Sequence, residues 1–172
     1  MKIIALRGAS GSGKSFLAKE ISKHLGGKVI CIDWIKSSVL RKEIVKNNDW
    51  TTIYKLTSEG LVSQLRELLD NNESLVIIEE LFINIELINK VISFSNDKNV
   101  EIKWFKINRS MEQLLEVTKS NERQERKVKN TEADLKSMIC SLKETPINGE
   151  IIINNDKSKE DVILQLLNYI EK

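Results

Sequence analysis

Proline, histidine and cysteine are scarce in this chain of 172 residues, which has one proline, one histidine and two cysteines. With only one proline and seven glycines, the composition is not that of a linker or a disordered tail. Cys31 and Cys140 lack metal-ligand spacing and lie in apolar runs, so we expect reduced, buried thiols. No run approaches the roughly 20 apolar residues that span a bilayer, and the apolar start is too short for a signal peptide. These absences predict a cytoplasmic protein with no membrane segment.

An excess of charge of one sign is also lacking. Lysine and arginine total 27 and aspartate and glutamate total 25, a net charge of +2. The chain therefore has no overall field that would attract nucleic acid, and any such contact requires a local basic patch. Its length fits a single domain spanning residues 1–172, with a hydrophobic share of 41% that suits a sizeable core.

The most informative stretch is residues 8–15, GASGSGKS, which fits the pattern G-x-x-x-x-G-K-[ST]. It follows an apolar run at residues 3–6 and precedes a helical pattern at residues 16–25, the context of a phosphate-binding loop. Glycines let the backbone N–H groups turn inward toward phosphates, where the start of the helix adds a positive dipole end. Lys14 would reach the β- and γ-phosphates and Ser15 would coordinate Mg²⁺. The alternative is a glycine-rich turn without a ligand. The predicted nucleotide-binding residues are Gly8, Gly11, Ser12, Gly13, Lys14, Ser15 and Phe16.

Four further short apolar runs, at residues 29–32, 75–78, 100–107 and 150–153, are typical of buried strands. Helical periodicity lies between them, and this alternation predicts an α/β fold with a parallel sheet covered by helices on both faces. The long connection at residues 34–73 contains two helical patterns. We expect it to form a substrate-side lobe at the carboxyl ends of the strands.

Asp33 follows the second predicted strand and so lies at the same sheet edge as the phosphate loop. A carboxylate there could accept the proton of an attacking hydroxyl or hold Mg²⁺ through water. Lys36 and Arg41 would turn toward the same cleft from a helix beginning at Trp34, and they are the predicted acceptor-binding residues together with Asp33. The structural alternative for Asp33 is an N-cap of that helix.

Taken together, GASGSGKS, the Asp33–Lys36 spacing and a basic helix late in the chain resemble the small P-loop kinases of the nucleoside-monophosphate-kinase-like superfamily. The chain is most similar to the kinase domains of phage-type polynucleotide 5′-hydroxyl kinases. The resemblance implies a three-layer α/β/α P-loop NTPase fold, with a five-stranded parallel sheet ordered 2-3-1-4-5 and a helical lid. In that family the Asp of D-x-x-R is the general base and the Arg contacts the acceptor phosphate. Asp33 matches the first position, whereas the second holds Lys36, which lacks the bidentate fork of arginine.

The resemblance also implies a lid at residues 119–130, where Arg123 and Arg126 would close over the transferred group as catalytic residues. Glu122 and Glu125 alternate with these arginines, so a solvated helix with internal ion pairs is the alternative. Similar kinases wrap the adenine after the last strand, here at residues 154–156, and we therefore expect ATP as the donor.

Glu79 and Glu80 follow the third predicted strand, where P-loop proteins place an acidic residue that fixes the water shell of the metal. Glu79, with Ser15, is the predicted magnesium site. A second acidic residue could instead polarise water in an ATPase switch that acts on a protein partner. Asp33 would have no role in such a switch.

Three aromatic residues, Trp34, Trp50 and Tyr54, fall in or beside the predicted substrate lobe. They could stack a nucleobase while nearby cations hold its phosphates. We favour packing in the core or under the lid.

The sequence therefore predicts an ATP- and Mg²⁺-dependent kinase that phosphorylates a hydroxyl group. A polynucleotide 5′-hydroxyl is one acceptor, and a small metabolite, nucleoside or nucleotide is the alternative. The sequence does not name the acceptor or the oligomeric state.

Overall fold

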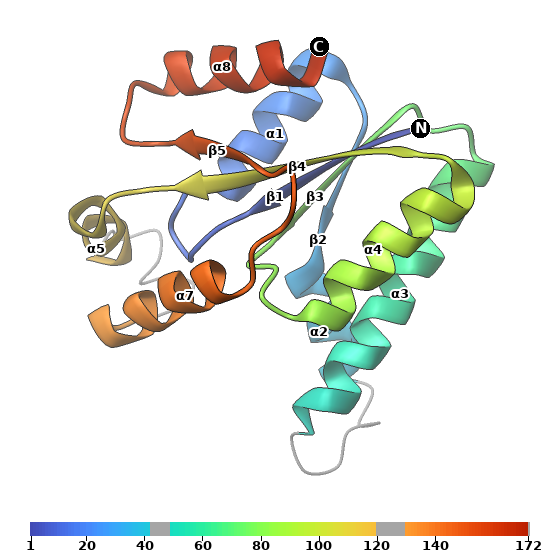
Figure 1. Ribbon diagram of the computed structural model, residues 1–172, viewed down its shortest axis with the longest axis horizontal. Helices are drawn as coiled ribbons and strands as arrows, with labels where there is room; N and C mark the ends of the chain where they lie inside the picture. The colour runs from blue at the N-terminus through green and yellow to red at the C-terminus, as the bar shows by residue number, and fades with distance from the viewer. Residues whose placement is uncertain (42–48, 120–129, 172) are drawn as a thin grey trace.

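A computed structural model describes residues 1–41, 49–119 and 130–171 of the chain. Strands and helices alternate along it (Figure 1). The strands are β1 (Lys2–Arg7), β2 (Lys28–Cys31), β3 (Leu75–Glu80), β4 (Glu101–Asn108) and β5 (Ile151–Asn154). The helices are α1 (Lys14–Leu25), α2 (Ile32–Arg41), α3 (Trp50–Asp70), α4 (Ile85–Lys98), α5 (Met111–Lys119), α7 (Glu132–Glu144) and α8 (Lys159–Glu171).

The five strands form one parallel sheet in the order β2-β3-β1-β4-β5, which confirms the predicted fold class and strand order. Most strand boundaries differ from the prediction by one or two residues, and two of these differences affect the site. β3 continues through Glu79 and Glu80, so both carboxylates lie on the strand itself. β2 ends at Cys31 and α2 begins at Ile32, which places Asp33 in the first turn of the helix and rules out the N-cap alternative.

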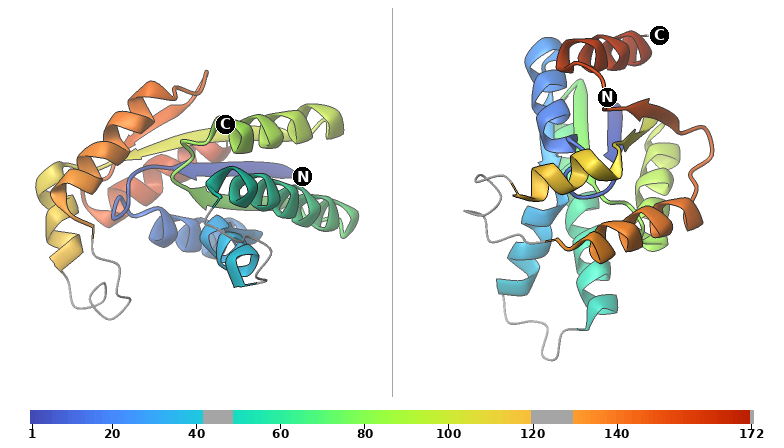
Figure 2. Two further views of the ribbon diagram at one scale, coloured as in Figure 1. Left: turned by 90° about the horizontal axis from the view of Figure 1, so that it is seen from below. Right: turned by 90° about the vertical axis from the view of Figure 1, so that its left-hand side faces the viewer.

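Helices cover both faces of the sheet, and the alternation of side chains along each strand divides the core in two (Figures 1 and 2). Ile3 and Ala5 of β1 face α3 and α4, packing with residues such as Leu61 of α3. Ile4 and Leu6 point to the opposite face, where α1 and α8 lie. Each face of β1 is fully buried, as a central parallel strand requires.

Beyond the carboxyl ends of the strands, α5 and α7 lie side by side in both further views (Figure 2). Leu114 of α5 packs with Leu135 and Leu142 of α7 and with Ala9 of the phosphate loop in a third apolar cluster. Thr131 caps α7 by exchanging hydrogen bonds with Asp134, as the sequence indicates. The two helices therefore pack together against the phosphate loop.

Some side chains predicted to be buried are not. Cys140 is exposed on the outer face of α7, and Cys31 is half-buried. Trp34 and Trp50 are 80% and 57% exposed, so they do not pack in the core, and the alternative of packing under the lid involves residues outside the described ones. Among the described residues, no helix combines the length and apolar character needed to cross a bilayer.

Candidate active site

The phosphate loop connects β1 to α1, and its glycines adopt backbone conformations that other residues rarely do. Gly13 has a φ of 99° and forms the N-cap of α1, which begins at Lys14. At Gly8 a side chain would collide with the neighbouring strand, because a Cβ there would lie 2.5 Å from the carbonyl oxygen of Ile107. Both glycines are thus required by the loop geometry, which turns the first N–H groups of α1 toward the pocket.

Three side chains hold this loop in place. The Lys14 ammonium donates to the carbonyl oxygens of Gly8 and Ala9, at 2.8 and 3.0 Å. From the far side, the Asn155 amide donates to the carbonyl of Ser12 at 2.7 Å, and Arg109 donates to that of Gly11 at 3.2 Å. The loop is therefore preorganised, with Lys14 lying across it where a phosphate would be met.

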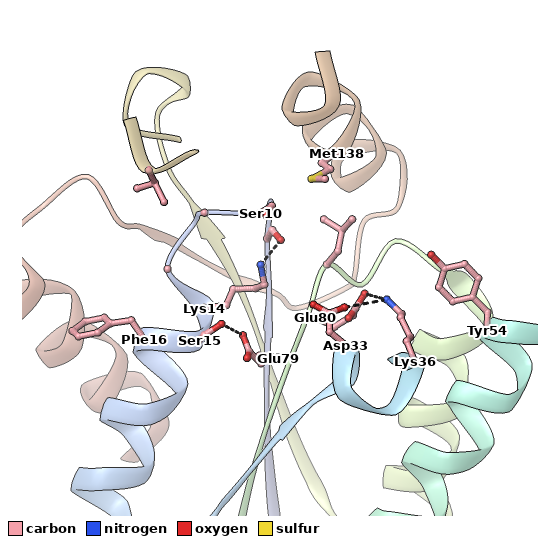
Figure 3. A pocket seen from close by; sticks show the side chains of 15 residues that line it. Ser10, Lys14, Ser15, Phe16, Asp33, Lys36, Tyr54, Glu79, Glu80 and Met138 are labelled. Carbon is pink, nitrogen blue, oxygen red and sulfur yellow. Dashed lines mark hydrogen bonds and ion pairs between the residues drawn. The ribbon is translucent and has the colours of Figure 1, made fainter. Parts of the chain in front are cut away.

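A pocket of about 420 Å³ opens beside the loop and joins it to α2, α3, β3 and α7 (Figure 3). Six predicted nucleotide-binding residues line this pocket, and Ser12 does not, because its side chain is buried on the other side of the loop. Phe16 turns its ring outward, where the Lys159 ammonium lies 5.3 Å from the ring centre. The lining residues are Gly8, Ser10, Gly11, Gly13, Lys14, Ser15, Phe16, Asp33, Lys36, Tyr54, Glu79, Glu80, Leu81, Val117 and Met138.

Glu79 and Glu80 point to opposite faces of β3, since they are consecutive residues of one strand. Glu79 follows Ile77 toward α1 and accepts a hydrogen bond of 2.6 Å from the Ser15 hydroxyl. Glu80 follows Ile78 toward α2 and accepts a hydrogen bond of 2.5 Å from the Lys36 ammonium. The strand thus supplies one carboxylate to the phosphate side of the pocket and one to the opposite side (Figure 3).

The pairing of Ser15 with Glu79 fits a magnesium ion. A hydroxyl and a nearly buried carboxylate are hard oxygen donors, and Mg²⁺ is usually held by one or two such groups together with waters and substrate phosphates. Burial, and then the negative charge of Glu79, raises the pKa of the neighbouring Cys31 thiol to about 11. Cys31 is therefore a neutral neighbour of this pair at physiological pH.

On the other side of the pocket, Lys36 is surrounded by partners. Its ammonium also lies 3.7 Å from the Asp33 carboxylate and 5.3 Å from the centre of the Tyr54 ring. Burial lowers the pKa of Lys36, but the charge and hydrogen bond of Glu80 outweigh burial, so the pKa is raised overall. Burial raises the pKa of Glu80, and Lys36 offsets this only in part. The Asp33 side chain is 79% exposed and faces the pocket.

Several predicted residues fall outside this description. Arg123 and Arg126, with residues 120–129 of the predicted lid, lie outside the described residues, as does the side chain of Arg41 at the end of α2. The structure does not test their predicted roles.

Two arginines that the sequence analysis missed support the site. Arg109 holds the phosphate loop, and its position directly after β4 is the signal that could have found it. Arg7 is fully buried at the end of β1 and donates to the carbonyls of Thr145 and Leu142, at 2.8 and 3.3 Å, and to Glu150 at 3.3 Å. A charged residue ending an apolar strand was the available clue. Arg7 ties the strand that leads into the phosphate loop to the end of α7.

Comparisons with known proteins agree with this arrangement. The protein family described as "AAA domain" matches residues 3–145. A search of curated proteins found no match.

Solved kinase structures share the fold over nearly the whole chain. Shikimate kinase from Bacteroides thetaiotaomicron is 17% identical, with 99% of each chain covered and a TM-score of 0.69. APS kinase from Mycobacterium tuberculosis, in complex with AMPPNP and APS, is 13% identical, with 99% of this chain and 98% of that chain covered and a TM-score of 0.69. A gluconokinase from Sinorhizobium meliloti is 15% identical, with 99% and 95% covered and a TM-score of 0.62. At these identities the likeness concerns the fold, and the finer resemblance to phage polynucleotide kinase domains is not shown.

Proposed function

We propose that this chain, which belongs to the AAA domain family, transfers the γ-phosphoryl group of ATP to a hydroxyl group of an acceptor. One observation carries the proposal. A single pocket holds Lys14 and Ser15 of a phosphate loop on one side and the exposed carboxylate of Asp33 on the other. Phosphoryl transfer needs this division, because its rate comes mainly from positioning and from stabilising charge.

The phosphate loop would bind the donor. The N–H groups of residues 11–15 would donate to oxygens of the β- and γ-phosphates, and the Lys14 ammonium would exchange its contacts with the carbonyls of Gly8 and Ala9 for such oxygens. Ser15 and Glu79 would hold Mg²⁺, which when bound neutralises charge on the phosphates. Asn155 and Arg109 keep the loop fixed while the ligand changes.

Asp33 would receive the acceptor. Its carboxylate accepts the hydroxyl proton as the acceptor oxygen forms a bond to the γ-phosphorus and the bond from that phosphorus to the β–γ bridging oxygen of ATP breaks, leaving ADP. Arg123 and Arg126 are proposed to close over the transferred group, and Arg41 to orient the acceptor, on the strength of the sequence.

Two acceptor classes are compatible with a hydroxyl kinase: a polynucleotide 5′-hydroxyl and a small metabolite or nucleoside. The fold shared with the shikimate kinase and gluconokinase structures is as compatible with the second as with the first. An ATPase switch of a protein partner would need neither Asp33 nor an acceptor.

Transfer of labelled γ-phosphate to a panel of 5′-hydroxyl RNA and DNA, nucleosides, sugars and water alone tests the proposal. We expect a labelled organic product from the wild type and none from Lys14→Ala. Lys19→Ala, which removes an exposed lysine of the same helix, should keep full activity. Label released only as inorganic phosphate would favour the switch, and full activity of Lys14→Ala would refute the site.

A further inference from the structure

We propose that the acceptor carries no phosphate or carboxylate group and is instead an uncharged or amine-bearing hydroxyl compound. The inference rests on the proposed kinase function and specifies its substrate class. Its basis is the pairing of Lys36 with Glu80 and Asp33 inside the pocket.

The charges of the pocket favour such an acceptor. Among the described residues that line it, the cations are Lys14 and Lys36 and the carboxylates are Asp33, Glu79 and Glu80, which leaves a net charge of −1. Lys14 lies on the phosphate loop and is assigned to the donor. Lys36 is thus the lysine available to the acceptor half of the described pocket.

Lys36 is already committed to protein carboxylates. Its side chain is only 15% exposed, and that of Glu80 is 8% exposed, with 2.5 Å between their charged atoms. Moving the ammonium toward an acceptor phosphate would leave Glu80 buried and unpaired. Removing the partner of a buried charge is strongly unfavourable, so Lys36 stays with Glu80 and acts as a positioning residue that also attracts Asp33.

A lysine is less able than an arginine to bind two anions at once. A guanidinium has five N–H donors on a planar fork and can bind a buried glutamate along one edge and a phosphate along another. The ammonium of Lys36 is a single point charge, and Glu80 lies closest to it. Within the part of the pocket that the structure describes, an anionic acceptor would therefore approach Asp33 and the neighbouring glutamates with its own charge unmatched, whereas a neutral or amine-bearing one would meet hydrogen-bond acceptors.

Matched pairs of acceptors that differ by one phosphate test the inference. We would measure kcat/KM for transfer to glucose and glucose 6-phosphate, to cytidine and cytidine 3′-monophosphate, and to glucosamine and glucosamine 6-phosphate, with the 5′-hydroxyl oligonucleotides as a further anionic set. We expect at least a tenfold preference for the unphosphorylated member of every pair that reacts. A preference for the phosphorylated members, or efficient labelling of oligonucleotides, overturns the inference and leaves the kinase function intact. Transfer to no acceptor, with ATP binding intact, overturns the proposed function and this inference with it.

A variant of Glu80 tests whether the ion pair of Lys36 with Glu80, and not the shape of the pocket, sets the acceptor preference. Glu80→Gln keeps the size of the side chain but releases the charge of Lys36, and should move the preference about tenfold toward phosphorylated acceptors while the Kd for ATP stays within a few-fold. Glu67→Gln, on the exposed side of α3, should leave the preference unchanged. An unchanged preference in Glu80→Gln means that Lys36 does not decide the acceptor class and overturns the argument.

Discussion

Replacing Lys36 by methionine should destabilise the protein by an amount that grows with pH. The substitution keeps the length of the side chain and removes the partner of the nearly buried Glu80 carboxylate. Breaking a buried ion pair in this way typically costs about 3–5 kcal/mol of unfolding free energy. We expect a loss in this range at pH 8.

The pH dependence follows from the pKa of Glu80. Burial raises it above the ordinary value of 4.5, and Lys36 acts in the opposite direction, so its removal raises the pKa further. A carboxyl group whose pKa is higher in the folded than in the unfolded protein stabilises the fold at a pH below its unfolded-state pKa. This stabilisation is lost as the pH rises through its folded-state pKa. Glu80 therefore stays protonated up to a higher pH in the variant than in the wild type. At pH 5 its deficit should shrink to about 1 kcal/mol, the worth of a lost hydrogen bond.

Urea denaturation of both proteins at pH 5, 6.5 and 8 measures this difference. The double variant Lys36→Met/Glu80→Gln, which removes both charges, should recover most of the stability at pH 8. Lys90→Met, at an exposed position of α4, controls for the loss of a surface charge. A deficit below 1 kcal/mol at pH 8, or one of equal size at all three pH values, would refute the buried pairing of Lys36 with Glu80.

Three further predictions concern separate parts of the molecule. Asp33→Asn should lower kcat by about two to four orders of magnitude and leave the Kd for ATP within a few-fold, as expected for a general base. Single-turnover kinetics and calorimetry measure the two quantities. If turnover and ATP affinity fell together, Asp33 would instead have a role in structure or metal binding. Arg7→Met should lower the unfolding free energy by about 3–5 kcal/mol, because Glu150 and two main-chain carbonyls lose a buried partner; a urea midpoint like that of the wild type would contradict the buried network. At pH 8, iodoacetamide should modify the exposed Cys140 quickly and Cys31 slowly, since a thiol with a pKa of about 11 is only about one thousandth thiolate at that pH. Peptide mass spectrometry should find that alkylation of Cys31 accelerates as the pH rises toward 11. Equal rates for the two cysteines at pH 8 would disprove the raised pKa of Cys31.

The phosphate loop and the positions of the strands follow from local patterns, whereas the order of the strands in the sheet was implied by the resemblance to P-loop kinases. The loop was readable because its glycines, Lys14 and Ser15 satisfy a fixed spacing between a strand and a helix. The strands could be predicted because each contains a short apolar run, and the central strands β1 and β3 are buried on both faces. Helix starts were less reliable, and α2 begins before Asp33 because the strand β2 stops at Cys31. The exposure of Trp34 could not be read from the sequence, since an aromatic residue fits a core as well as a surface.

The sequence by itself determined that a phosphate-loop motif joins the first strand to the first helix and that an acidic residue follows the second strand. Only the tertiary structure decided which carboxylate serves which side of the pocket. Glu79 and Glu80 are adjacent in the chain, yet one meets Ser15 and the other meets Lys36. Their partners are 64 and 44 residues away, and the contacts depend on the register of β2 beside β3 and on the two-residue alternation of a strand. Neighbouring residues therefore acquire different chemistry because the sheet sends their side chains to opposite faces.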